Sequence, residues 1–147
     1  MLIKSMLAKK EKLNSLAENS NIEDVVSLEE IFNCSDNSFV KDALKIYHSQ
    51  HKSMHVRSFI HDKIEQYKKE RNLQLNAENE NQILTYKTNS DLLLKSIIRF
   101  MKHAERENIP MLSGTTELLQ VQNEFYINHC VSNNSCNSNY TDDKRNV

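Results

Sequence analysis

The chain has 147 residues but only one glycine and one proline, where usual frequencies would give roughly ten and seven, and this argues against a many-stranded fold with tight turns. Its 19 basic and 20 acidic side chains leave a net charge of −1, which excludes a global attraction to nucleic acid or membranes. No apolar run reaches the roughly 18 residues of a membrane span, and residues 1–12 lack a signal-peptide pattern.

The composition therefore predicts an all-α fold. We expect a small irregular bundle of five or six short helices that forms a single domain over residues 1–131. Residues 132–147 have too little apolar surface to offset the cost of ordering, and we predict a disordered tail there. The three cysteines are an odd number without a secretory pattern, which argues against a disulfide framework. We expect a cytoplasmic protein.

The first expected element is an amphipathic helix over about residues 2–18, where apolar residues recur every three or four positions. A second helix from Ile22 is expected to restart at Ser27, because Ser27 and Glu30 stand at the spacing of a capping box. Together, the expected helices have more apolar faces than one small bundle needs, and one of these faces lies at the start of the chain. We therefore predict an interaction surface formed by Leu2, Ile3, Met6 and Leu7.

Residues 39–71 contain neither glycine nor proline, yet the apolar pattern predicts two helices there. At about 100° per residue, the apolar residues of 38–50 lie opposite those of 54–71. We therefore expect a break near residues 49–53, with Ser53 as the N-cap of the second helix. The alternative is one long helix wedged between two partners. The residues expected to be buried are Val40, Ala43, Leu44 and Tyr47 before the break and Val56, Phe59, Ile60, Ile64 and Tyr67 after it.

Residues 72–90 allow several interpretations and could contain a boundary within the domain. Leu73, Leu75 and Ala77 alternate with polar residues, and residues 83–88 favour a strand by propensity. A minor β-hairpin near residues 73–88 would explain both features, although no glycine is present for its turn. A polar linker with a short helix is an equally good interpretation.

Two further helices are expected in the last third of the chain. One spans about residues 89–107, is capped by Asn89 or Ser90, and ends before Pro110 because proline disfavours a helical residue in front of it. The other spans about residues 117–130. We expect this last helix to bury Leu118, Val121 and Phe125, with Leu119 and Tyr126 as further candidates.

Three histidines are the most ligand-like group in the sequence. His48, His51 and His55 stand at i, i+3 and i+7, a spacing at which neutral imidazoles on one helix face can bind a first-row metal ion. The expected helix break falls inside this group and would spoil that geometry. If His51 and His55 are compared with the His-Glu-x-x-His motif of zinc proteases, Lys52 occupies the position of the glutamate. We assign no metal site and no cofactor, and keep a metal- or pH-responsive switch at the three histidines as a hypothesis.

Local motifs for catalysis are missing from the sequence. A single glycine excludes the glycine-rich loops that bind dinucleotides and phosphates, and there is no nucleophile elbow. The acidic pairs at residues 23–24 and 29–30 fall in the first turns of expected helices, where they suit capping and the helix dipole. We therefore predict a protein that is not an enzyme and has no catalytic residues.

The sequence combines several expected helices that each have an apolar face with the lack of a recognisable group of catalytic residues. This predicts a helical protein that acts through protein–protein contacts, as an adaptor, chaperone or regulator, and that self-associates. All stripes could instead close on one monomeric core. A second function is a small nucleic-acid-binding transcriptional regulator, because residues 41–71 carry eight basic and four acidic residues, a net charge of +4. The residues assigned to that alternative are Arg57, Lys63, Lys68, Lys69 and Arg71.

Overall fold

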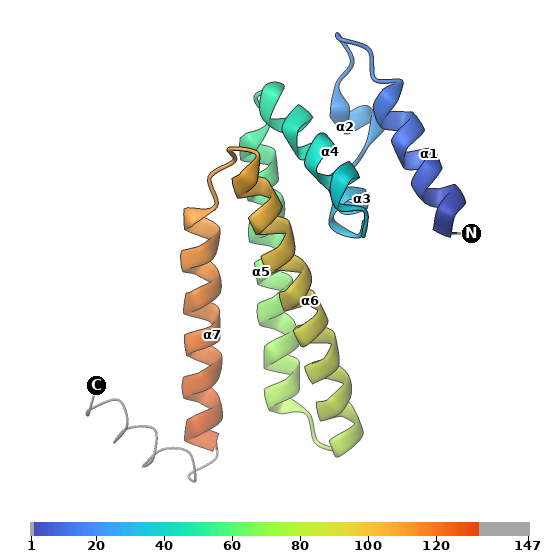
Figure 1. Cartoon of the computed structure of the whole chain (residues 1–147). Helices are drawn as coiled ribbons and strands as arrows, with labels where there is room; N and C mark the ends of the chain where they lie inside the picture. Colours follow the sequence, from blue (N-terminus) through green and yellow to red (C-terminus); the bar gives the residue numbers. More distant parts are fainter. Residues whose placement is uncertain (1, 133–147) are drawn as a thin grey trace.

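The computed structural model describes residues 2–132, and the side chains of residues 7–127. This part of the chain contains seven α-helices and no strand, which confirms the all-α prediction (Figure 1). Three of the helices are longer than the short helices expected. Residues 133–147 of the predicted disordered tail lie outside the described residues. The helices are α1 (Leu2–Asn14), α2 (Ile22–Val25), α3 (Leu28–Phe32), α4 (Asn37–Ser49), α5 (Ser53–Asn76), α6 (Glu80–Arg106) and α7 (Leu112–Ser132).

The centre of the molecule is an antiparallel pair formed by α5 and α6, and α7 runs along the other side of α5 (Figure 1). The α5–α6 contact is the most extensive in the described residues, and α5–α7 comes next. At one end, α4 contacts both α5 and α6, while α1, α2 and α3 pack against α4. Within residues 2–132, no helix combines the length and the apolar character needed to cross a bilayer.

The predicted break between the two middle helices is confirmed. Helix α4 ends at Ser49 and α5 begins at Ser53, and between them His51 has a left-handed φ of 61°. The change of direction lets the apolar faces of both helices reach the core. Tyr47, before the break, and Val56, after it, are both buried. Ser53 is not the N-cap, because Lys52 holds that position and α5 begins without a side-chain cap.

Residues 72–90 are helical except for a short connection at residues 77–79, so the predicted β-hairpin is wrong. Helix α5 continues to Asn76, a short connection follows, and α6 begins at Glu80. Asn79 supplies the N-cap of α6, since its side-chain oxygen accepts a hydrogen bond from the backbone N–H of Gln82 at 2.8 Å. Strand propensity depends on having a neighbouring strand, and here α5 offers a helical partner instead.

Buried apolar side chains form one continuous cluster from α2 to α7. Phe32 on α3 and Phe100 on α6 belong to this cluster, and their rings meet the ring of the partly buried Phe59 on α5 at centroid distances of 5.6–5.7 Å. Gly114, in the first turn of α7, lies close to this core: a Cβ atom there would be 3.2 Å from Cγ2 of Ile60. Glycine therefore permits the start of α7 to lie directly against α5.

Candidate interaction surface

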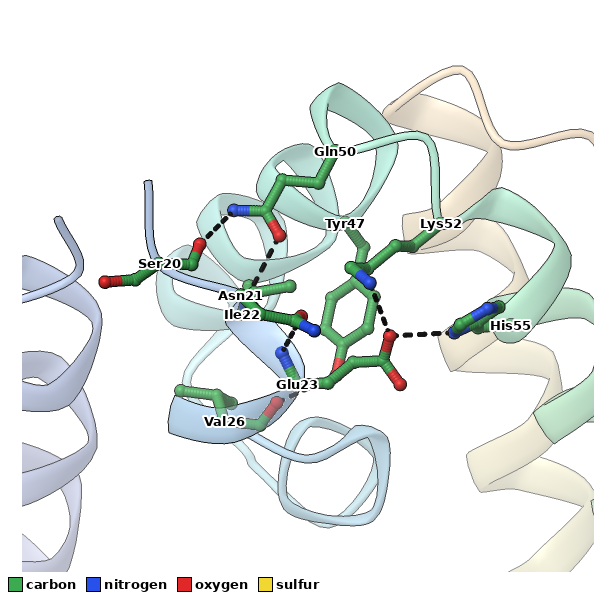
Figure 2. Close-up of polar contacts among 9 residues, drawn as sticks. All are labelled: Ser20, Asn21, Ile22, Glu23, Val26, Tyr47, Gln50, Lys52 and His55. Atoms are coloured by element: carbon green, nitrogen blue, oxygen red, sulfur yellow. Dashed lines mark hydrogen bonds and ion pairs between the residues drawn. The ribbon is translucent and has the colours of Figure 1, made fainter. Parts of the chain in front are cut away.

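A polar joint fixes the N-terminal helices to the α4–α5 connection (Figure 2). The side chain of Gln50 donates to the carbonyl of Ser20 at 2.8 Å and accepts from the N–H of Ile22 at 3.0 Å. The buried hydroxyl of Tyr47 donates to the carbonyl of Val26 at 2.8 Å. Burial raises the pKa of Tyr47 far above its usual value, so this hydroxyl remains a donor at ordinary pH.

The carboxylate of Glu23 is the acidic group of the polar joint and contacts two basic side chains (Figure 2). Its Oε1 lies 2.7 Å from Nζ of Lys52 and 2.8 Å from Nδ1 of His55. The hydrogen bond from Lys52 has the largest effect on Glu23 and holds the pKa of its carboxyl below the usual value. His48 has a different neighbour, with Nδ1 3.2 Å from Oγ of Ser53. His48 and His55 thus take part in separate contacts, and His51 occupies the turn between the two helices with its left-handed φ.

Another histidine belongs to a group of potential metal ligands, His61, Glu65 and Glu117, whose donor atoms all lie within 4.8 Å of one another. Nδ1 of His61 lies 2.7 Å from Oε1 of Glu117, and this contact raises the pKa of His61. His61 and Glu117 border a cavity of about 310 Å³ between α5 and the start of α7. An imidazole with two carboxylates could hold a divalent cation. The sequence pattern does not reveal this group, because Glu117 belongs to α7 and is far from His61 and Glu65 in the sequence.

Lys63, assigned to nucleic acid from the sequence, is engaged within the fold. Its side chain is only 13% exposed, and Nζ lies 2.9 Å from Oε1 of Glu29. The same ammonium group lies 4.8 Å from the centroid of the Phe32 ring. Lys63 therefore connects α5 to α3.

Arg71 is engaged in the same way, nearer the C-terminal end of α5. Its Nε donates to the hydroxyl of Tyr67 at 2.9 Å, and its Nη2 lies 3.3 Å from Oδ1 of Asp91. Its guanidinium also lies 4.6 Å from the ring centroid of Phe125 on α7. The nucleic-acid alternative stays a prediction, and its remaining residues are Arg57, which borders the cavity, and the exposed Lys68 and Lys69.

The interaction surface predicted near the start of the chain lies on α1. Leu7 is 53% exposed, while Leu2, Ile3 and Met6 fall outside the described side chains. Helix α1 contacts the rest of the molecule mainly through α4. An ion pair between Lys10 and Asp36, 3.0 Å apart, strengthens this attachment.

Helix α7 has two apolar faces. Its inner face packs on α5 with Leu118 and Val121, which are buried as predicted. Its outer face carries Leu112, Leu119 and Ile127, which are 79%, 56% and 60% exposed. Intervals of seven and eight residues keep these three within an arc of about 80° at about 100° per residue.

The expectation that Leu119 and Tyr126 are buried is wrong, since both are exposed. The reason is geometric: a helix packed along one neighbour buries only the arc that faces it, and α7 packs chiefly on α5. The seven-residue interval from Leu112 to Leu119 is the sequence signal for a second apolar face on this helix.

Comparison of the chain with protein-family models, with curated proteins and with solved structures finds no match.

Proposed function

We propose that the protein is a non-enzymatic, cytoplasmic helical protein that acts through protein–protein contacts, as an adaptor, chaperone or regulator. We further propose that it self-associates through the outer face of α7. The observation that carries this proposal is the second apolar face of that helix, with Leu112, Leu119 and Ile127 exposed. A second copy of the protein presents the same outer face of α7, so two α7 helices can pack against each other about a two-fold axis.

The size of this face sets the expected affinity. Full burial of a large aliphatic side chain stabilises by about 1.5–3 kcal/mol, and a symmetric contact would bury parts of six such side chains. Association itself costs about 4–15 kcal/mol in lost freedom of motion. Because only parts of these side chains become buried, the gain exceeds the cost by at most about 8 kcal/mol, which corresponds to a micromolar Kd. We therefore expect a weak dimer with a Kd in the micromolar range or above.

Sedimentation equilibrium over a range of protein concentrations tests this proposal. The test variant combines Leu112→Ser with Leu119→Ser, and the matched control combines Leu84→Ser with Leu92→Ser on α6, where the two leucines are 62% and 59% exposed. We expect the mass of the wild type and of the control to rise with concentration, while the α7 variant stays monomeric with an unchanged circular dichroism spectrum. A monomeric wild type, or an α7 variant that associates like the wild type, would contradict self-association through α7.

A further inference from the structure

Four basic side chains follow one another along the second half of α6. They stand at i, i+4, i+7 and i+11, which places them within an arc of about 60° at about 100° per residue. At about 1.5 Å per residue, they extend over about 16 Å of the helix. All four are exposed. This basic row consists of Lys95, Arg99, Lys102 and Arg106.

The basic row lacks acidic partners among the side chains of residues 7–127. Other cations in that part of the chain do form ion pairs, for example Lys63 with Glu29 and Lys87 with Asp91. In the row, Arg99 donates to the carbonyl of Phe32 at 3.4 Å, and no carboxylate among the described side chains lies within ion-pair distance of any of the four. Like charges three or four residues apart on a helix repel one another, so this arrangement reduces the stability of α6.

A groove of about 390 Å³ runs beside the basic row and reaches Asn37 at the start of α4. Ile98, which is 38% exposed, and His103, which is 9% exposed, also line it. The groove therefore combines a row of cations with an accessible apolar side chain. Apart from the imidazole of the nearly buried His103, none of the described lining residues is aromatic, whereas proteins that bind single-stranded nucleic acids stack bases on aromatic rings.

We propose that this groove binds an acidic helical segment of a partner protein. Carboxylates spaced at i, i+4, i+7 and i+11 on such a segment repeat the spacing of the basic row. An apolar residue between them would contact Ile98, and the partner's charge would relieve the repulsion along α6. The overall charge of −1 gives a long polyanion no general attraction to the molecule, which favours a short acidic segment. The groove includes no residue of α7, so this inference does not depend on self-association.

The test uses a fluorescent helical peptide with glutamates at those four positions and leucines between them, and a second peptide with glutamine in place of glutamate. Binding to the full-length protein is followed by fluorescence anisotropy at about 50 and 200 mM salt, where screening differs clearly. The groove variant combines Lys95→Glu with Lys102→Glu. The control combines Lys68→Glu with Lys69→Glu, which changes the net charge equally on exposed positions of α5.

We expect the glutamate peptide to bind the wild type and the control equally, and more weakly at higher salt. The groove variant should bind it at least about tenfold more weakly. No binding by the wild type, equal binding of the glutamine peptide, or an equal loss in the control would overturn the proposal. A DNA or RNA duplex is titrated in parallel, and tighter binding of the duplex than of the peptide would assign the basic row to nucleic acid and also overturn it.

Two further measurements separate binding from folding. The groove variant should melt at the same or a higher temperature than the wild type, because Lys102→Glu replaces repulsion by attraction to Arg99 and Arg106. Burial, followed by Arg106 and Arg99, holds the pKa of His103 below its usual value, with Glu107 acting in the opposite direction. A bound carboxylate should raise that pKa, as followed by NMR of the imidazole, and an unchanged titration in the peptide complex would contradict the proposal.

Discussion

Removing the hydroxyl of Tyr47 is the most direct test of the polar joint. The substitution Tyr47→Phe keeps the ring and its packing and deletes only the donor to the carbonyl of Val26. Tyr47 is 1% exposed and Val26 is 0% exposed, so water cannot replace the lost hydrogen bond without entering the core. The mutant therefore contains a buried carbonyl oxygen that no longer has its hydroxyl donor.

The cost follows from that loss. A buried polar group left without its partner destabilises by about 1–3 kcal/mol, which is more than the net value of a typical hydrogen bond. We expect Tyr47→Phe to lower the free energy of unfolding by about 2 kcal/mol. For a chain near 150 residues, this corresponds to a decrease in Tm of about 4–8 °C.

Urea unfolding followed by circular dichroism measures this change, with the m-value checking that the transition is unaltered. Tyr86→Phe is the control, because Tyr86 is only partly buried and its hydroxyl makes no hydrogen bond within the described side chains. The control should lose less than about 0.5 kcal/mol. Equal losses in the two variants, or a negligible loss in Tyr47→Phe, would refute the reasoning.

Three other predictions concern the remaining contacts. Gly114→Val should destabilise by about 1–3 kcal/mol in urea unfolding, since its side chain would overlap Ile60, and an unchanged midpoint would argue against the close approach of α7. Ser27→Ala removes the capping box of α3 and should cost about 1 kcal/mol in the same assay, with no loss if the cap is unimportant. The pKa of His61 is raised above 6.5 by Glu117, so this pair stabilises the fold below pH 6.5 and the contribution is lost as pH rises through the raised pKa. The stability difference between the wild type and His61→Gln, measured by thermal melts across this pH range, should therefore shrink with increasing pH, and a constant difference would contradict the ion pair.

Periodicity predicted the helix break in the middle of the chain and a capping box predicted the start of α3, although the capping rule failed at Ser53, which is not the N-cap of α5. The opposite phases of Tyr47 and Val56 required a change of direction between them, and the structure has one at His51. The pairing of Ser27 with Glu30 likewise placed the start of α3, where both hydrogen bonds of a capping box form. These predictions succeeded because each depends on neighbours in sequence.

Features that depend on distant segments were not predictable in the same way. The strand-favouring residues near Tyr86 became helical because α5 lies beside them, and β-propensity is decided by such surroundings. Glu117 meets His61 only because α7 returns along α5. Leu119 was expected in the core because a helical pattern indicates which residues share a face, but not how many neighbours cover the helix.

The short connection between α5 and α6 has a consequence for how the chain folds. The two helices with the most extensive mutual contact are neighbours in sequence, so bringing them together closes only a small loop. Contacts between nearby segments favour rapid folding. We expect this helical pair to assemble first, from the middle of the chain outward, and to serve as the template on which the earlier and later helices dock.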